Sequence, residues 1–146
     1  MEKYTVLVKK CITKDDIADA KSVRYKVFTV EQNIDQDIEE SNDEKCDHFV
    51  AYSENKPVGA GRINYLEDNI AKVERMAVLK DFRGQQIGSK ILKCMINYLI
   101  GKKISLVTLD AQYHAKNFYE NLSFKQEGEI FDEVGIPHIK MVKKLT

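Results

Sequence analysis

The sequence predicts an α/β fold of the α+β class with a mixed sheet. Its first strands are antiparallel, and one later strand is joined to them by a parallel crossover. Three strand-like segments follow one another between His48 and Leu79, separated by polar turns, as is typical of neighbouring antiparallel strands. Residues 85–100 carry apolar side chains at helical spacing. The short, almost wholly apolar segment Ile104–Leu109 follows, and such a segment is typical of a strand covered on both faces. A strand, a helix and a second strand in this order predict a right-handed crossover.

The N-terminal third predicts a strand, a helix and an acidic segment. Tyr4–Val8 is rich in β-branched and apolar residues and predicts the first strand. Asp15 and Asp16 are suited to cap a helix whose apolar residues recur at intervals of three and four, and which ends near Val30. Asp35–Asp47 holds seven acidic residues against one lysine, so we expect an exposed loop or a short helix there.

The middle of the chain predicts three consecutive strands. His48–Tyr52 and Val58–Tyr65 flank the turn residues Glu54–Pro57, a pattern typical of an antiparallel hairpin. A second polar turn precedes a third strand, Ile70–Leu79. Because consecutive strands usually pair, we expect all three in one sheet.

The strongest helix follows and spans Gln85–Ile100. Its buried stripe is expected to consist of Ile87, Ile91, Leu92, Met95, Ile96 and Leu99, and Gly101 is a stop signal. Beyond the strand Ile104–Leu109 we expect a short helix over Ala111–Asn121. The tail is strand-like at Phe124–Gln126 and Ile136–Val142.

Composition limits the possible functions. The 146 residues suit one domain over 1–146, and 23 basic against 23 acidic residues argue against a nucleic-acid binder. No apolar stretch reaches the roughly 20 residues of a membrane span, and the N-terminus lacks the apolar core of a signal peptide. Cys11, Cys46 and Cys94 are widely spaced, without a paired motif for a disulfide framework or a zinc site. We therefore expect a cytoplasmic protein with reduced thiols that binds no metal, nucleic acid or membrane.

Residues 78–90 join the third strand to the strongest helix and form the best candidate for an anion site. Backbone N–H groups at a helix start, together with the positive end of the helix dipole, bind phosphate oxygens. Gly84 and Gly88 allow close approach to the backbone, and Arg83 adds positive charge. An ordinary strand-to-helix turn has the same appearance. A nucleotide-triphosphate loop and a dinucleotide fingerprint are both absent from the sequence.

This junction carries a family resemblance. Glu74–Gly88 resembles the acetyl-CoA motif of the GNAT N-acetyltransferase superfamily, in which Arg or Gln, two residues, Gly, one residue and then Gly or Ala form the pyrophosphate loop. Downstream, Gln112, Ala115, Phe118–Glu120 and Phe124 resemble the family's next helix. Three further segments resemble the YjcF-like branch of this superfamily: residues 23–32, Asp47–His48, and Gly135–His138 with Met141. Gln86 replaces the middle loop glycine and Ser123 replaces the usual glycine before Phe124, so the sequence departs from the family pattern twice.

The resemblance implies a mixed, mostly antiparallel sheet of six or seven strands flanked by about four helices. The sheet would be splayed between its fourth and fifth strands, so that acetyl-CoA, the co-substrate, lies in the cleft. No metal is implied. The cofactor contacts implied by the resemblance come from Met76, Ala77 and Val78 on the strand, from Arg83, Gly84, Gln85, Gln86, Ile87, Gly88 and Ser89 in the loop, and from Gln112 beside pantetheine.

The chemistry is attack of an amine on a thioester, and an ammonium group must first lose its proton. Glu74 is one candidate base, because two-residue periodicity places it on the strand face of Met76 and Val78; the alternative is a solvated carboxylate. His138 is the other candidate, and its alternative is a hydrogen-bonded structural histidine. The resemblance places Tyr119 at the thioester sulfur as proton donor to the thiolate, whereas packing alone suggests a core aromatic. Backbone N–H groups of residues 76–78 would bind the carbonyl oxygen. No cysteine has the context of a nucleophile, which favours direct transfer.

The acceptor is the least defined part of this hypothesis. The resemblance places the end of the first helix beside the acceptor cleft, and we expect Arg24, Phe28 and Glu31 to be acceptor-side residues there. The acidic run would attract a cationic amine, although such runs are usually solvated faces. A small-molecule or peptide amine is the expected partner of a monomer or homodimer. Two alternatives stay open: a non-catalytic acyl-CoA-binding or sensing module, and a protein-interaction domain. His48 is expected to be structural and His114 exposed.

Overall fold

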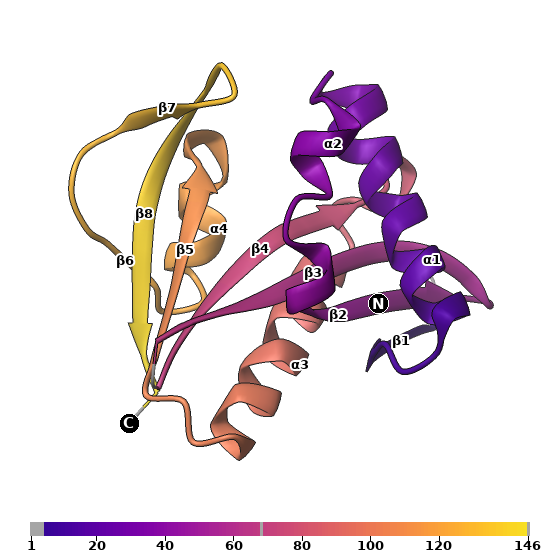
Figure 1. Cartoon of the computed structure of the whole chain (residues 1–146), viewed down its shortest axis with the longest axis horizontal. Coiled ribbons are helices and arrows are strands. Elements are labelled where there is room, and N and C mark those ends of the chain that lie inside the picture. The colour runs from indigo at the N-terminus through magenta and orange to yellow at the C-terminus, as the bar shows by residue number, and fades with distance from the viewer. Residues whose placement is uncertain (1–4, 68, 146) are drawn as a thin grey trace.

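A mixed sheet runs through the centre of the computed structural model, which describes residues 5–67 and 69–145. Within these residues its strands are β1 (Val6–Lys10), β2 (Asp47–Ser53), β3 (Lys56–Glu67), β4 (Ile70–Val78), β5 (Leu106–Gln112), β6 (Lys125–Gln126), β7 (Phe131–Glu133) and β8 (Ile136–Lys144). They are ordered β1-β2-β3-β4-β5-β8-β6, with β7 paired to β8 (Figure 1). All pairs are antiparallel except β4 with β5, which confirms the predicted mixed sheet and its crossover.

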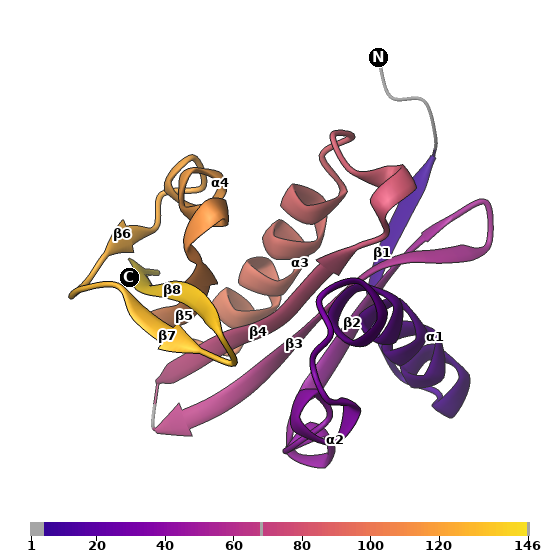
Figure 2. The ribbon, with the colours of Figure 1, turned by 90° about the horizontal axis from the view of Figure 1, so that it is seen from above.

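Helices cover both faces of the sheet (Figure 2). The longer segments are α1 (Lys14–Arg24), the π-helical η1 (Tyr25–Glu31), α2 (Gln36–Glu39), α3 (Ile87–Gly101) and α4 (Lys116–Glu120). Single turns occur at η2 (Asp43–Lys45), η3 (Lys80–Phe82) and η4 (Tyr113–Ala115). The buried side chains of α1 pack with Val50, Ala60 and Ala77 on one face of the sheet. The predicted apolar stripe of α3 is buried on the other face. No helix of the described residues has the length and apolar character needed to cross a membrane.

Several predicted boundaries shift. The first strand was expected at Tyr4–Val8; it runs from Val6 to Lys10, and Tyr4 lies outside the described residues. Thr13, rather than the predicted aspartates, caps α1: its side chain accepts from the Asp16 N–H, and the Asp16 side chain accepts from the Thr13 N–H. This reciprocal arrangement is a capping box. The chain continues past Arg24 as a π-helix to Glu31, close to the predicted end near Val30.

The C-terminal part differs in its short elements. The predicted helix Ala111–Asn121 begins late, because β5 continues to Gln112 and α4 covers only Lys116–Glu120. The sheet has eight strands where six or seven were expected. β7 was not predicted, because its three residues are all exposed and therefore carry no inward-facing pattern.

The acidic segment is only partly exposed, which corrects the expectation. It forms α2 and η2, as a short helix was predicted, but Glu39 and Asp43 are buried, with 4% and 6% of their surfaces exposed. Both accept hydrogen bonds from the buried Arg24. Buried carboxylates are stable only with such partners.

A bulge in β4 changes which residues share a face. Arg62 pairs with Glu74, whereas Ala60 pairs with Ala77, so two β4 residues lie opposite Gly61. Arg75 takes the left-handed conformation, with φ +56°. Glu74 therefore lies with Arg62 on the α1 and α2 side, whereas Met76 lies beside Gly61 and Met95 on the α3 side. The prediction that Glu74 shares a face with Met76 and Val78 was wrong, because the extra residue breaks the two-residue alternation.

β4 and β5 separate soon after they begin. Their parallel register covers only Ile70–Lys72 against Leu106–Thr108. Beyond these pairs β4 continues toward α1 and η1, whereas β5 continues toward α4 (Figures 1 and 2). The implied splay is therefore present, and it opens a cleft in the middle of the sheet.

Candidate functional site

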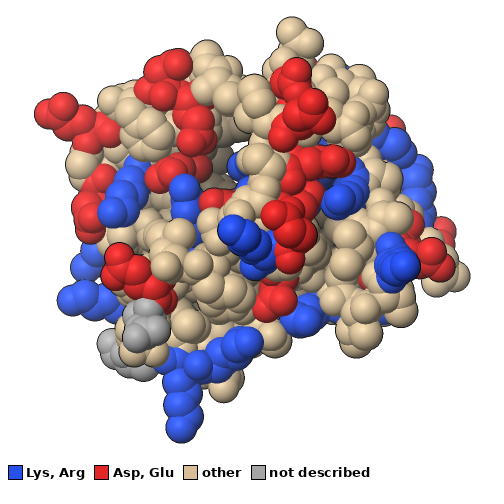
Figure 3. Space-filling view, in the orientation of Figure 1, with Lys and Arg blue, Asp and Glu red and all other residues tan. Residues whose placement is uncertain are grey.

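The cleft between the splayed strands holds a cavity of ≈ 710 Å³. Its walls come from η1 and α2 on one side and from β5, α4 and the β7–β8 turn on the other, with β4 between them. The space-filling view shows the hollow between these two halves, with carboxylates on both rims (Figure 3). Of the predicted site residues, the cavity is lined by Phe28, Glu31, Glu74, Met76, Ala77, Val78, Arg83, Gln112, Tyr119 and His138.

The β4–α3 junction forms the predicted glycine-bearing loop. Gly84 and Gln86 both adopt left-handed backbone conformations, with φ of +80° and +65°, and α3 begins at Ile87. Gln86 thus takes a conformation that glycine adopts without strain. Within the described part of the chain, no acceptor is found for the N–H groups of residues 84–89. Free donors at the start of a fifteen-residue helix are the groups that can bind an anion.

The side chains around this loop are closely placed. Gly88 faces Phe118: a Cβ at position 88 would lie 3.3 Å from Phe118 Cζ. Arg83 is turned away from the loop toward η1, where both terminal nitrogens donate to the Glu31 carboxylate at 2.8 Å. The Arg83 hydrogen bonds hold the pKa of Glu31 below its usual range. Gly84, Gln85, Gln86, Ile87, Gly88 and Ser89 are outside the cavity lining.

Gln112 links the two sides of the cleft. Its side-chain amide donates to Gln32 Oε1 at 2.9 Å, and its own Oε1 accepts from Gln32 at 3.2 Å. The exposed His114 contacts the same oxygen at 2.7 Å. Gln32 lines the cavity; it ends the segment that resembles the YjcF-like branch, but no role was predicted for it.

Tyr119 projects from α4 into the cavity lining and has 8% of its surface exposed. Its ring packs edge-on against Phe118 and Phe124, with centroids 4.9 and 5.9 Å away. Among the described residues its hydroxyl has no hydrogen-bonding partner, and burial raises the pKa of the phenol. The ring is thus a core aromatic, while its hydroxyl remains available to a molecule in the cavity.

Glu74 is held by cations. Arg62 donates to Glu74 Oε1 from Nε at 2.9 Å and from Nη2 at 2.8 Å. Lys72 lies 3.6 Å from the other carboxylate oxygen and 2.9 Å from Asp110. Three nitrogens from two cations thus surround this carboxylate.

His138 lies on β8 at the opposite wall, 5% exposed, and is stacked on Phe131. Its Nδ1 lies 2.7 Å from the carbonyl oxygen of Ile136, which requires a proton on Nδ1. In the neutral ring Nε2 is then the acceptor, and it lies 3.4 Å from Glu133 Oε2. Glu133 lines the cavity and was missed because β7 was missed.

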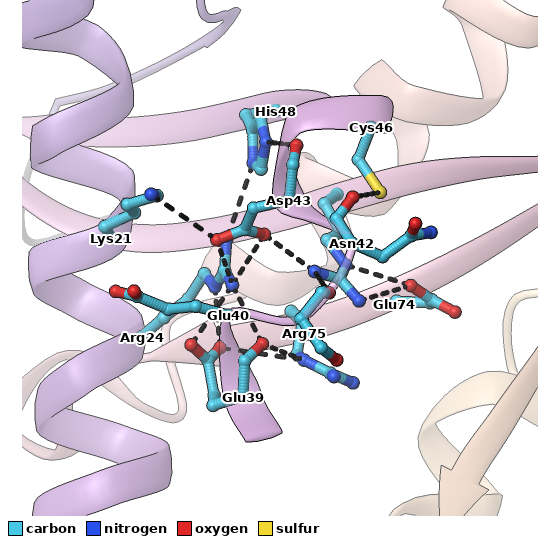
Figure 4. Close-up of polar contacts among 12 residues, drawn as sticks. Lys21, Arg24, Glu39, Glu40, Asn42, Asp43, Cys46, His48, Glu74 and Arg75 are labelled. Atoms are coloured by element: carbon cyan, nitrogen blue, oxygen red, sulfur yellow. Dashed lines mark hydrogen bonds and ion pairs between the residues drawn. The ribbon is translucent and has the colours of Figure 1, made fainter. Parts of the chain in front are cut away.

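Arg24 is buried and does not line the cavity; Figure 4 shows it among the carboxylates that it contacts. Its side chain is 0% exposed and donates to Glu39 Oε2 at 2.7 Å and to Asp43 Oδ1 at 2.9 Å. Of the three expected acceptor-side residues, only Phe28 and Glu31 reach the cavity.

Further charged residues extend this buried network. Arg62 donates to Asp43 at 2.6 Å, and Arg75 donates to the backbone carbonyl of Glu39 at 2.9 Å. His48 Nε2 donates to the Asp43 carbonyl at 2.8 Å, and burial lowers the pKa of His48, consistent with its expected structural role. Three arginines (Arg24, Arg62 and Arg75) and the carboxyl-bearing residues Glu39 and Asp43 therefore hold α2 and η2 against α1 and the sheet. In the described residues, no cluster of three or more histidine, cysteine, aspartate or glutamate side chains is arranged to hold a metal.

Comparison with known proteins identifies the family and the fold. The acetyltransferase (GNAT) domain family matches residues 13–145. The N-acetyltransferase YjcF of Bacillus subtilis, itself uncharacterised, is 37% identical over 134 residues, covering 89% of this chain and 94% of its own. The crystal structure of Escherichia coli ElaA superposes with a TM-score of 0.83 at 22% identity, covering 95% and 99% of the two chains. An aminoglycoside 6'-N-acetyltransferase complexed with coenzyme A superposes with a TM-score of 0.78 at 13% identity, covering 96% and 97%. At these identities the two structures establish the fold alone.

Proposed function

Because this chain belongs to the GNAT acetyltransferase family and is thereby an N-acetyltransferase, we propose that it moves an acetyl group from acetyl-CoA directly to an amine held in the cleft. Residues 1–146 would act as one catalytic unit, with a small-molecule amine as acceptor. The observation that carries the proposal is the Tyr119 hydroxyl, which lines the cavity without a partner among the described residues.

The donor site follows from the free backbone groups. The N–H groups of residues 84–89 would hold the pyrophosphate at the start of α3. Among the residues that the structure describes, the edge of β4 that faces β5 has no strand partner over residues 73–78, so N–H groups of Met76–Val78 would be free to bind pantetheine and the thioester oxygen. Gln112 would contact pantetheine after exchanging its hydrogen bond with Gln32. An aminoglycoside 6'-N-acetyltransferase of the same fold forms a complex with coenzyme A, and this supports coenzyme A as the group bound by this chain.

His138 is the better placed of the two candidate bases. Its neutral tautomer offers a lone pair on Nε2, and Glu133 at 3.4 Å would stabilise the imidazolium formed when the ammonium gives up its proton. Glu74 is already paired with Arg62 and Lys72, so protonating it would sacrifice these ion pairs. We assign Glu74 an electrostatic role and His138 the role of base.

The reaction requires the amine nitrogen to lose two protons. His138 would take the first from the ammonium group and release it to solvent. The neutral amine then attacks the thioester carbonyl, the C–S bond breaks, and the thiolate takes a proton from the Tyr119 hydroxyl. The nitrogen loses its second proton as the amide forms, and this proton, carried by solvent, restores the Tyr119 phenol. No acyl-enzyme is required, and burial raises the pKa of the Cys94 thiol on α3, which disfavours a nucleophilic thiolate.

The test is thiol release from acetyl-CoA with a panel of amines, combined with Tyr119→Phe. We expect turnover to fall about ten- to a thousandfold while acetyl-CoA affinity, measured by calorimetry, changes little. Tyr113→Phe is the matched control, because Tyr113 is exposed and outside the cavity lining. Wild-type turnover in Tyr119→Phe across pH would remove the proton-donor role, and failure to bind acetyl-CoA at millimolar concentration would refute the donor site.

A further inference from the structure

Building on the proposed function, we propose that the acceptor is an amphipathic amine, with one ammonium group beside a hydrocarbon group, and that Ile38 and Val134 hold the hydrocarbon. We call these two side chains the apolar clamp. Both line the cavity. Ile38 belongs to α2 and Val134 to the turn between β7 and β8, and these two elements lie on opposite sides of the molecule in Figure 1.

The first half of the clamp comes from a helix with inverted polarity. In α2 the charged Glu39 is buried and the apolar Ile38 is 52% exposed, the reverse of an ordinary surface helix. The reason is that Arg24 requires the Glu39 carboxylate. Arg75 also donates to the backbone carbonyls of Glu39 and Ile38, at 2.9 and 3.4 Å. These bonds fix α2 on β4 and leave the Ile38 side chain at the cavity.

The second half of the clamp is a strained valine. Val134 and Gly135 form the two-residue turn between β7 and β8, and Val134 has φ +48°. A turn with both central residues left-handed favours asparagine or glycine at this position, and a β-branched residue there is a rare exception. Strain of this kind concentrates at functional sites. The geometry of the turn does not account for a valine at this position. An apolar side chain there does suit a cavity that receives a hydrocarbon, because Val134 is 47% exposed and lines the cavity.

Charge next to the clamp supplies the other half of the recognition. Glu133, adjacent to Val134 and 48% exposed at its side chain, lies 3.4 Å from His138. An ammonium between these two groups would place its attached hydrocarbon near Val134 and, across the cleft, near Ile38. A polyamine or a polyhydroxylated amine would instead press charged or hydrated groups against apolar side chains, which costs desolvation. The surface therefore favours a single positive charge on a hydrocarbon body.

The experiment compares hexylamine with diaminohexane, which has the same chain and a second ammonium at its end. Thiol release from acetyl-CoA gives kcat/KM for each amine, and calorimetry of each amine with the coenzyme A-saturated protein gives affinity without turnover. We expect hexylamine to exceed diaminohexane by about tenfold or more in both measurements.

Two variants test the clamp itself. Val134→Asn installs the residue the turn prefers, so the thermal midpoint should hold or rise while kcat/KM for hexylamine falls about tenfold. Glu54→Asn is its control, at the same position of another two-residue turn, with φ +50° and outside the cavity lining. Ile38→Gln should act like Val134→Asn, and Ile12→Gln, at an 82% exposed site, should act like wild type.

The outcomes separate the clamp from the reaction. Equal or better use of diaminohexane, or an unchanged hexylamine kcat/KM in both clamp variants, overturns the clamp and leaves acetyl transfer intact. If neither amine releases thiol, hexylamine binding decides: tight, Val134-dependent binding supports the clamp although the proposed reaction fails, and absence of binding overturns it. A clamp effect seen only with longer acyl donors would assign these residues to the acyl chain and overturn the proposal.

Discussion

Replacement of Arg24 by methionine should destabilise the protein by about 3–5 kcal/mol, the usual cost of removing one partner from a buried ion pair. The guanidinium is fully buried and donates to the carboxylates of Glu39 and Asp43. Methionine fills much of the volume but donates nothing. Glu39 would keep only Arg75, whose Nε is 3.7 Å away, whereas Asp43 would keep Arg62 at 2.6 Å. Most of the loss should therefore come from Glu39.

Urea unfolding at neutral pH measures the loss, with Lys21→Met as the matched control. Lys21 also faces Asp43, at 3.7 Å, but is 38% exposed at its side chain, so its removal should cost no more than about 1 kcal/mol. Combining Arg24→Met with Glu39→Leu should recover part of the stability, because it removes the stranded charge. The reasoning is refuted if Arg24→Met costs no more than Lys21→Met.

The pH dependence provides a second check. Burial alone would raise the pKa of Asp43, but Arg24 and Arg62 outweigh it and hold this pKa below its usual range. A depressed pKa in the folded state gives stability that is present above the unfolded value of about 3.9 and is lost as pH falls through the folded value. Without Arg24, protonation of Asp43 breaks fewer ion pairs. The difference in the free energy of unfolding between wild type and Arg24→Met should therefore become smaller below about pH 4. A constant gap would contradict this assignment.

Three further changes test the loop and the first helix. Gly88→Asp places a negative charge where the pyrophosphate would bind, so it should weaken acetyl-CoA binding, measured by calorimetry, at least about tenfold. Gly88→Ala is the control for added bulk, and normal acetyl-CoA binding by folded Gly88→Asp would refute the placement of the loop. Gln86→Gly should stabilise the fold by about 1 kcal/mol, because φ is +65° at this residue. If the variant also binds acetyl-CoA more weakly, the Gln86 amide is a ligand of the cofactor; if it binds acetyl-CoA more tightly, glycine is the better residue for the site. The N–H groups of Ile12 and Thr13 are the chief reason that the pKa of Asp16 is lowered to about 2. The stability that this carboxylate contributes should therefore be lost as pH falls from about 4 to about 2. In Asp16→Asn the free energy of unfolding should depend less on pH in that window, and an unchanged dependence would contradict the capping role.

Local patterns predicted the regular elements well. The apolar stripe of α3 and the β2–β3 hairpin are encoded within short windows, by helical spacing and by turn residues, and both were confirmed. The order of strand, helix and strand was sufficient for the parallel pairing of β4 and β5. These features depend on residues that are neighbours in the sequence, which is why one sequence sufficed.

Features that depend on distant partners were not predictable in this way. The burial of Glu39 and Asp43 follows from Arg24 and Arg62, which lie 15 to 19 positions away in the sequence. The bulge occurs at an arginine, with no glycine to signal it, and it moved Glu74 to the other face. The cavity likewise joins Glu31 to Arg83, 52 positions apart. A run of seven acidic residues with only one lysine within it was the available hint that arginines elsewhere had to compensate it.

The early separation of β4 and β5 also bears on aggregation. A strand with unpaired backbone groups at the surface of a protein is a template for another chain, and proteins protect such edges. Here the parting of two central strands creates two such edges within the sheet, where they face each other across the cleft and are flanked by helices (Figure 2). The outermost strands need not supply free donors for ligands, since the interior of the sheet does so. The unpaired backbone groups that can bind a ligand therefore lie inside the cleft, where a strand of another molecule is less able to pair with them.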